Sequence, residues 1–278
     1  MSVRVITDSA ATLPVDLAEQ LGVEVVPLRI ALGDRSVRDG SIDVAELVDS
    51  SIDVSTSGPT PGDYLEAIDQ SGDEGAVVLT LSREMGAGSY LAAQAAARTV
   101  KTPLRVIDTE CAAGAQGLVV AAAADVAHSG AAIDQVAAAA VRVIERVRLV
   151  ATLPSLDHLA RSGHVPDAAA WAARSVGLRP VIEFRRGRVR PLRPARSAPA
   201  ARQRLLDRIT NAKPPGRCRL HVCALHALAA DAANDLLAAI DTEHAPATSL
   251  VGSFSTAMIV HAGPGVLGLA WWWEPLEA

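Results

Sequence analysis

Short runs of β-branched residues alternate with helix-like segments through the first half of the chain. The runs have the length of strands, and the segments between them have the apolar periodicity of helices. Strands that alternate with helices of this length favour a parallel sheet covered on both faces. The expected strands are residues 3–6, 23–31, 76–81 and 104–107, and the expected helices are residues 14–21, 42–50, 61–71, 88–100, 114–128 and 132–147.

The pattern changes beyond about residue 150. Residues 184–191 indicate a β-hairpin that turns at Gly187. The mixed order of elements favours an α+β arrangement with a partly antiparallel sheet. We therefore expect an N-terminal α/β domain over residues 1–150 and a C-terminal α+β domain over residues 151–278. The other expected strands are residues 149–153, 179–184, 217–224, 249–251 and 267–273, and the expected helices are residues 200–209 and 229–240.

The composition is rich in small apolar residues. Of 278 residues, 50% are hydrophobic and only 3% aromatic, so alanine, valine and leucine must fill a sizeable core. The net charge of −5 argues against a nucleic-acid surface. From the residues before the first expected strand we expect no secretory leader, and no apolar run approaches the roughly 20 residues of a membrane helix. We expect a soluble, cytoplasmic protein.

One segment of the second half has the residue types of a metal site. It contains Cys218, His221 and Cys223. On a strand, successive side chains point to opposite faces, so Cys218 and Cys223 would face opposite ways. We therefore expect no metal ion there, and with Cys111 as the third cysteine there is no disulfide framework.

Polar segments follow or precede the expected elements at positions where ligands bind. In open α/β sheets, ligands lie where the carboxyl ends of strands meet helix N-termini. Hydroxyls and free N–H groups at helix starts suit a carboxylate or phosphate, although ordinary helix capping explains each segment taken singly. The four segments are residues 7–11, 56–61, 82–89 and 108–109.

His261 stands beside a Gly-Pro-Gly sequence at residues 263–265. Glycine lets another group approach the backbone closely, and proline fixes a turn, so a histidine held there could present a ring N–H to a ligand. A hairpin turn with an incidental histidine is the alternative. The chain has no Gly-x-Ser-x-Gly elbow, no phosphate-binding loop of the Walker type and no His-Glu-x-x-His motif. Residues 185–196 are rich in arginine, which indicates either a solvated face or a docking patch for an acidic partner or a phosphate.

Taken in order, these segments resemble the DegV family of bacterial fatty-acid-binding proteins over essentially the whole chain. The resemblance implies a DegV-type two-domain α/β fold. The stretches that carry it are Ile6–Ala11, Thr56–Pro61, Leu81–Gly88, Val106–Thr109, Leu159–Val165, Arg179–Ile182 with Gly187 and Arg196, and His261–Gly265.

The resemblance also implies a function and a site. A long-chain fatty acid would lie between the domains, and its carboxylate would be held by Thr56, Ser57, His261 and the backbone N–H of Gly86. The protein would use no cofactor and catalyse nothing itself. It would present the carboxylate to the ATP-binding subunit of a fatty acid kinase, with Arg196 on the docking surface.

The chain departs from the family pattern within this site. Gly86 stands where the family usually offers a serine hydroxyl. By this interpretation Ser82 or Ser89 would take its place, and Ser9 is a further candidate. Gly58 replaces a glutamine and His164 an arginine. Two alternatives stay open: a Ser/His-dependent hydrolase of acyl esters, and a lipid sensor without a kinase partner.

Overall fold

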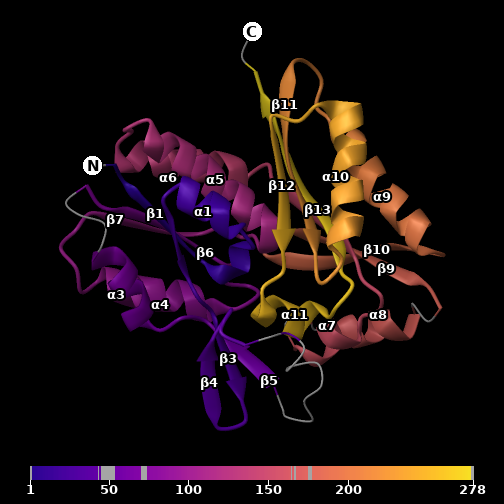
Figure 1. Ribbon diagram of the computed structural model, residues 1–278, viewed down its shortest axis with the longest axis horizontal. Coiled ribbons are helices and arrows are strands. Elements are labelled where there is room, and N and C mark those ends of the chain that lie inside the picture. Colours follow the sequence, from indigo (N-terminus) through magenta and orange to yellow (C-terminus); the bar gives the residue numbers. More distant parts are fainter. Residues whose placement is uncertain are drawn as a thin grey trace.

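A parallel sheet forms the centre of the N-terminal half in the computed structural model (Figure 1). The structure describes residues 2–42, 44, 54–69, 74–163, 165, 167–174 and 177–276. The sheet has four strands in the order β2-β1-β6-β7, and all neighbouring pairs are parallel, as the sequence predicts. The strands are β1 (Arg4–Asp8), β2 (Val23–Val26), β6 (Ala76–Thr80) and β7 (Leu104–Asp108).

Helices cover both faces of this sheet (Figure 1). Alternation along β6 explains the two layers: Val78 packs with the α3 and α4 side, whereas Leu79 packs with the α5 and α6 side. The helices are α1 (Val15–Gln20), α3 (Pro61–Asp69), α4 (Ala87–Ala97), α5 (Ala113–His128) and α6 (Ile133–Ile144). Most of the expected helix over residues 42–50 lies outside the described residues.

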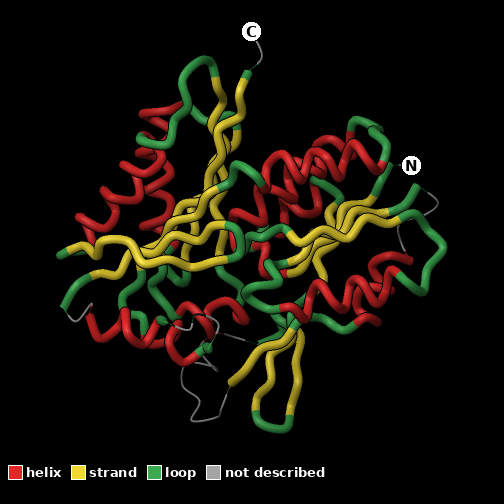
Figure 2. Tube along the Cα trace, turned by 180° about the vertical axis from the view of Figure 1, so that it is seen from behind, coloured by secondary structure: helices red, strands yellow, loops and turns green. Residues whose placement is uncertain are grey.

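The C-terminal half forms a six-stranded mixed sheet, with the order β10-β9-β8-β13-β11-β12 (Figures 1 and 2). Only the β11–β12 pair is parallel. One face packs against α9 (Ala198–Thr210) and α10 (Ala230–His244), and the other faces α5. The strands are β8 (Arg148–Thr152), β9 (Arg179–Arg185), β10 (Arg188–Ala195), β11 (Cys218–His226), β12 (Thr248–Ser253) and β13 (Leu267–Pro275).

A third, three-stranded antiparallel sheet was not expected from the sequence. Its order is β4-β3-β5, with β3 (Arg29–Leu32), β4 (Arg35–Arg38) and β5 (Val54–Ser57). The single strand predicted over residues 23–31 is wrong: β2 ends at Val26, and the chain enters a different sheet after Pro27, which lacks a backbone donor. Three short helices were also missed, α7 (Asp157–Arg161), α8 (Ala168–Arg174) and α11 (Thr256–Ala262).

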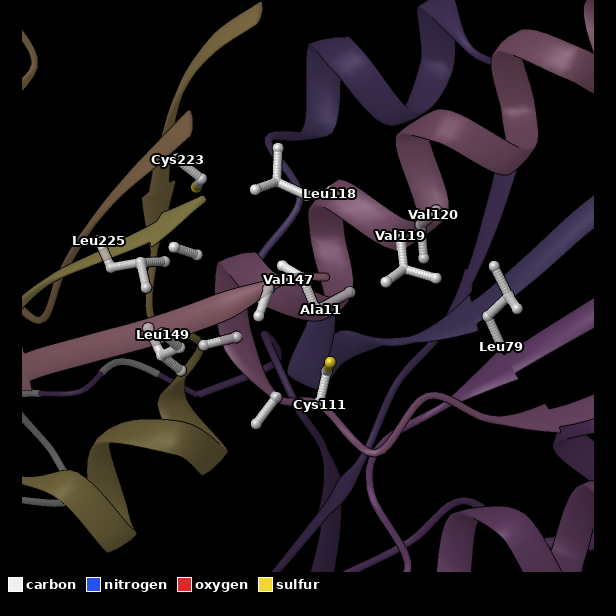
Figure 3. Close-up of a cluster of buried hydrophobic side chains, with 14 of the residues drawn as sticks. Ala11, Leu79, Cys111, Leu118, Val119, Val120, Val147, Leu149, Cys223 and Leu225 are labelled. Atoms are coloured by element: carbon white, nitrogen blue, oxygen red, sulfur yellow. The ribbon is translucent and has the colours of Figure 1, made fainter. Parts of the chain in front are cut away.

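Helix α5 lies between the two large sheets, and its side chains belong to one hydrophobic cluster with residues of both (Figure 3). Its glycines permit this close fit. A Cβ at Gly114 would lie 2.6 Å from Cys223 Sγ on β11, and a Cβ at Gly117 would lie 2.8 Å from the Ala11 carbonyl oxygen. Because this core is shared, the division into two domains near residue 150 stays a prediction. In the part of the chain that the structure describes, no helix is long and apolar enough to span a bilayer.

The close approach of α5 to Ala11 gives a test of the shared core. Gly117→Ala gains intrinsic helix propensity of about 1 kcal/mol, but it pushes a methyl group into backbone, and overpacking of this kind costs roughly 1–3 kcal/mol. We expect a net loss of about 1 kcal/mol in the free energy of unfolding, measured by urea denaturation.

Gly62→Ala in α3 is the matched control. A Cβ there meets only Thr60 Oγ1, at 3.7 Å, which is an ordinary contact. This variant should be as stable as the parent or slightly more so. Equal effects of the two substitutions would contradict the proposed role of Gly117.

Candidate ligand-binding site

An apolar cavity of about 90 Å³ lies between the two halves of the molecule. It is bounded by the inner face of the six-stranded sheet, by the start of α5 and by α7 and α11. Among the described residues that line the cavity, only His261 has a polar side chain. The lining residues are Met85, Ala112, Ala113, Leu149, Ala151, Leu153, Leu159, Ile182, Phe184, Val189, Phe254, Met258, His261, Ala262 and Val266.

His261 lies in the last turn of α11, so the hairpin-turn alternative is wrong. Ser255 starts this helix, because its side chain accepts a hydrogen bond from Met258 N at 3.4 Å. Gly263 ends it with φ of +80°, a conformation that favours glycine. A Cβ at Gly263 would also lie 2.6 Å from the His158 ring on α7, so a side chain there would displace the helix that carries His261.

Thr56 and His261 meet directly, although they are distant in the sequence. Thr56 Oγ1, on β5, is hydrogen-bonded to His261 Nε2, on α11. Thr56 and Ser57 are successive strand residues, so their side chains lie on opposite faces of β5, and that of Ser57 is exposed. The structure therefore brings Thr56, and not Ser57, to the histidine.

Asp39 fixes the start of the same helix, and sequence reasoning missed it. Its carboxylate accepts hydrogen bonds from Ala257 N at 3.0 Å and from Ser9 Oγ at 2.5 Å. Ser9 Oγ also accepts a hydrogen bond from Leu28 N, at 3.0 Å. Ser9 thus supports Asp39 rather than facing the cavity. No local sequence motif marks Asp39, because its partners are distant along the chain.

The first turn of α4 lies against the end of β5. A Cβ at Gly58 would lie 2.4 Å from Ser89 N and 2.6 Å from the carbonyl carbon of Gly88, so a side chain at position 58 would push the two segments apart. Gly86 is the N-cap of α4, and its N–H already donates to Ser82 O at 3.1 Å. The N–H groups of the residues after Gly86 lie in the first turn, where a helix offers no internal acceptor.

The other serine candidates have different surroundings. Ser82 is fully buried, and a Cβ at Gly187 would lie 2.8 Å from its Oγ, which places Ser82 under the tip of the β9–β10 hairpin. Ser89 is also buried, near Asp8 and Tyr64 in the first sheet layer. Of these two serines, only Ser89 comes close to the end of β5, through its backbone N–H. His164 lies outside the described residues.

Most polar groups at the carboxyl edge of the parallel sheet hydrogen-bond to one another. Asp8 is fully buried and accepts from Leu81 N at 2.8 Å and from Gln116 Nε2 at 2.9 Å. Burial raises the pKa of Asp8, although these hydrogen bonds oppose the shift. Thr109 Oγ1 donates to Thr80 O at 2.7 Å. These hydrogen bonds of Asp8 and Thr109 hold the strand ends together, and a ligand-binding role for the four polar segments stays a prediction.

The prediction that Cys218 and Cys223 face opposite sides of their strand, β11, is confirmed. Cys223 is buried in the cluster around α5, whereas Cys218 packs with the α9 and α10 side. His221 stacks on Trp272 with ring centroids 4.4 Å apart. Among the residues that the structure describes, no group of three or more His, Cys, Asp or Glu side chains is placed to hold a metal ion.

Comparison with known proteins identifies the family. A family model described as an uncharacterised protein of the DegV family matches residues 2–274. The chain belongs to the DegV family. A DegV domain-containing protein of Streptomyces coelicolor is 32% identical to it over 275 residues, which cover 96% of this chain and 97% of that protein.

Solved structures of similar proteins share the fold. A DegV family protein from Thermus thermophilus, described for its fatty acid binding, has a TM-score of 0.88 at 27% identity and covers 98% of this chain and 99% of its own. The fatty acid kinase B3 protein of Streptococcus pneumoniae, loaded with linoleic acid, has a TM-score of 0.84 at 21% identity, with coverage of 98% and 99%. The predicted DegV-type α/β fold is confirmed.

In this DegV protein, Asp63 holds the small sheet that carries Thr56. Its carboxylate accepts from Arg29 of β3 at 2.9 Å and from Arg38 of β4 at 3.1 Å, and it accepts from Thr60 N at 2.8 Å at the start of α3. Burial raises the pKa of Asp63, but the hydrogen bonds from Thr60 and the charge of Arg29 outweigh this effect. The net result is a pKa of about 2, below the ordinary carboxyl value.

Stability should therefore depend on pH through this carboxylate. A lowered pKa means that the stabilisation is complete above the ordinary carboxyl pKa and is lost as the pH falls from about 4 to 2. For Asp63→Asn we expect a loss of about 1–2 kcal/mol at pH 7 and a flatter stability profile between pH 4 and 2. Thermal unfolding across this range measures it. An unchanged profile would show that Asp63 does not anchor the sheet.

Proposed function

We propose that this DegV protein binds a long-chain fatty acid in the apolar cavity between its two halves. The observation that carries the proposal is the placement of His261, hydrogen-bonded to Thr56, at the cavity wall, where the other lining side chains among the described residues are apolar. The fatty acid binding described for the Thermus thermophilus relative supports it.

The physical chemistry of the cavity suits this ligand. Burial of an acyl chain gains roughly 0.8 kcal/mol for each CH₂ group. A buried carboxylate without partners would be strongly unfavourable, so it must lie where donors are available. We assign Thr56 and His261 as its side-chain donors, and the first turn of α4 beyond Gly86 as its backbone donor, because a helix N-terminus favours an anion.

The cavity must widen to take a whole long chain. Its volume of about 90 Å³ corresponds to roughly six to nine water-sized spaces. Met85 and Met258 line it, and the unbranched methionine side chain adapts to irregular spaces. We infer that these two residues move when the tail enters.

We further propose that the protein is a carrier that presents the carboxylate to a fatty acid kinase. Arg196 is exposed just beyond the end of β10. The register of β9, β8 and β13 places the end of β10 at the same edge of the sheet as Leu267, the first residue of β13. The turn that follows α11 leads directly into Leu267. An acidic kinase subunit docked at Arg196 would therefore approach the head-group side of the cavity. The hydrolase alternative has less support, because His261 Nε2 contacts a threonine and Ser57 faces away.

The direct test is to identify the lipid that co-purifies with the protein. Mass spectrometry after denaturing extraction should find a fatty acid in stoichiometric amount. In delipidated protein, we expect His261→Gln and Thr56→Val each to weaken fatty acid binding by roughly ten-fold or more, because hydrogen bonds to charged groups contribute about 1.5–3 kcal/mol. Isothermal titration with palmitate and oleate measures the change.

Two control variants sharpen this test. His128→Gln changes a histidine at the end of α5, away from the cavity, and should bind as the parent does. Ser57→Ala should have a smaller effect than Thr56→Val, because Ser57 lies on the opposite face of β5. Unchanged affinity in His261→Gln would reject the assigned head-group site.

Gly86→Ser should strengthen binding. A Cβ at Gly86 meets only Leu81 Cδ2, at 3.8 Å, and the φ of −175° suits any residue. The new hydroxyl restores the group that this chain lacks, and one added hydrogen bond of about 1 kcal/mol predicts an affinity several-fold higher. Gly86→Ala controls for the loss of glycine flexibility and should leave the affinity near that of the parent. Weaker binding in Gly86→Ser than in Gly86→Ala would place the carboxylate elsewhere.

A further inference from the structure

A row of arginines crosses the outer face of the six-stranded sheet. Trp271 of β13 pairs with Arg148 of β8, and Arg188 of β10 pairs with Arg185 of β9. Leu149 pairs with Phe184, so the same antiparallel register places Arg148 opposite Arg185. Residues that face each other across strands point to the same side, which here is the side covered by α9 and α10.

Beyond the end of α9 this face is hollowed by a pocket of about 250 Å³. It lies on the opposite side of the sheet from the fatty acid cavity, because Leu149 and Phe184 face the cavity and their neighbours Arg148 and Arg185 face the pocket. Its walls combine arginines with indole and proline rings. The lining residues are Glu145, Arg146, Arg148, Arg185, Ala212, Pro214, Trp271, Trp273 and Pro275.

The pocket has an excess of positive charge. In the described part of the chain, no hydrogen bond or ion pair engages the guanidinium group of Arg148 or Arg185, whereas Glu183 is paired with Arg208 at 3.0 Å and Glu145 with Arg146 at 3.6 Å. Burial and the neighbouring charge of Arg185 lower the pKa of Arg148, although the charge of Glu183 opposes the shift. Like charges placed opposite each other in a sheet are destabilising. Such a local cost is typical of positions that serve binding rather than folding.

We propose that this pocket is a second ligand site, which binds a phosphate monoester attached to a planar apolar group, such as a nucleoside monophosphate. Two unpaired guanidinium groups match the charge of about −1.5 to −2 on a phosphate monoester at pH 7. Guanidinium groups suit phosphate oxygens, to which they donate in pairs. The rings of Pro214 and Pro275, together with the small exposed parts of the largely buried Trp271 and Trp273, provide the apolar wall for the planar part of the ligand.

Adenosine monophosphate, inorganic phosphate and adenosine are the probes for this site. Isothermal titration at physiological ionic strength should show adenosine monophosphate binding at least ten-fold more tightly than either of the other two. Quenching of tryptophan fluorescence should accompany it, because two of the four tryptophans line the pocket. Equal binding of adenosine monophosphate and inorganic phosphate, or no binding at millimolar concentration, would overturn the proposal.

Variants locate the site and separate binding from folding. Arg148→Gln and Arg185→Gln should each weaken adenosine monophosphate binding by ten-fold or more. Arg188→Gln removes a charge from the same row but does not line the pocket, so it should change the affinity by less than two-fold. Both pocket variants should unfold at the parent temperature or above it, because repulsion is relieved. Equal losses of adenosine monophosphate affinity in all three variants would indicate a non-specific basic surface. Tighter binding of a hexaglutamate peptide than of adenosine monophosphate would indicate an acidic protein partner. Either result would refute the proposed nucleotide site.

Discussion

Helix α5 packs simultaneously against the parallel sheet and the six-stranded sheet, and the positions of both sheets depend on that contact. Gly114 and Gly117 remove the side chains that would hold the helix away from Cys223 and Ala11. Alanines and valines fill the rest of the interface, so the core stays thin and closely packed. The cavity opens at the N-terminal end of this helix, where Ala112 and Ala113 form part of its wall.

A second connection between the halves is polar, and it forms the head-group end of the proposed site. Helix α11 from the C-terminal half is held against the small sheet by the Asp39 carboxylate at its start and by the Thr56–His261 hydrogen bond at its end. Asp63 in turn holds that small sheet to α3 through Arg29 and Arg38. The two side chains that we assign to the carboxylate, Thr56 and His261, are thus held in place by hydrogen bonds of Asp39 and Asp63, which have no assigned contact with the ligand.

Strands β8 and β9 contribute to both proposed ligand sites. Their alternate residues face opposite sides of the sheet, so Leu149 and Phe184 line the fatty acid cavity, and Arg148 and Arg185 line the basic pocket. A strand pair cannot shift on one side without moving the residues on the other. The two pockets therefore share a rigid wall, although they differ in chemistry.

The amino-acid sequence determined the parallel sheet, most helices of the first half, the β9–β10 hairpin and the opposite faces of Cys218 and Cys223, because local periodicity and turn residues encode these features. The order of its motifs also determined the family. Only the tertiary structure decided that Thr56 meets His261 and that Ser9 supports Asp39. It also decided that the side chains of Asp8 and Thr109 form hydrogen bonds within the protein at the edge of the parallel sheet. These contacts join residues far apart in the chain, and a polar side chain at a strand end has the same local pattern whether its partner is the protein or a ligand.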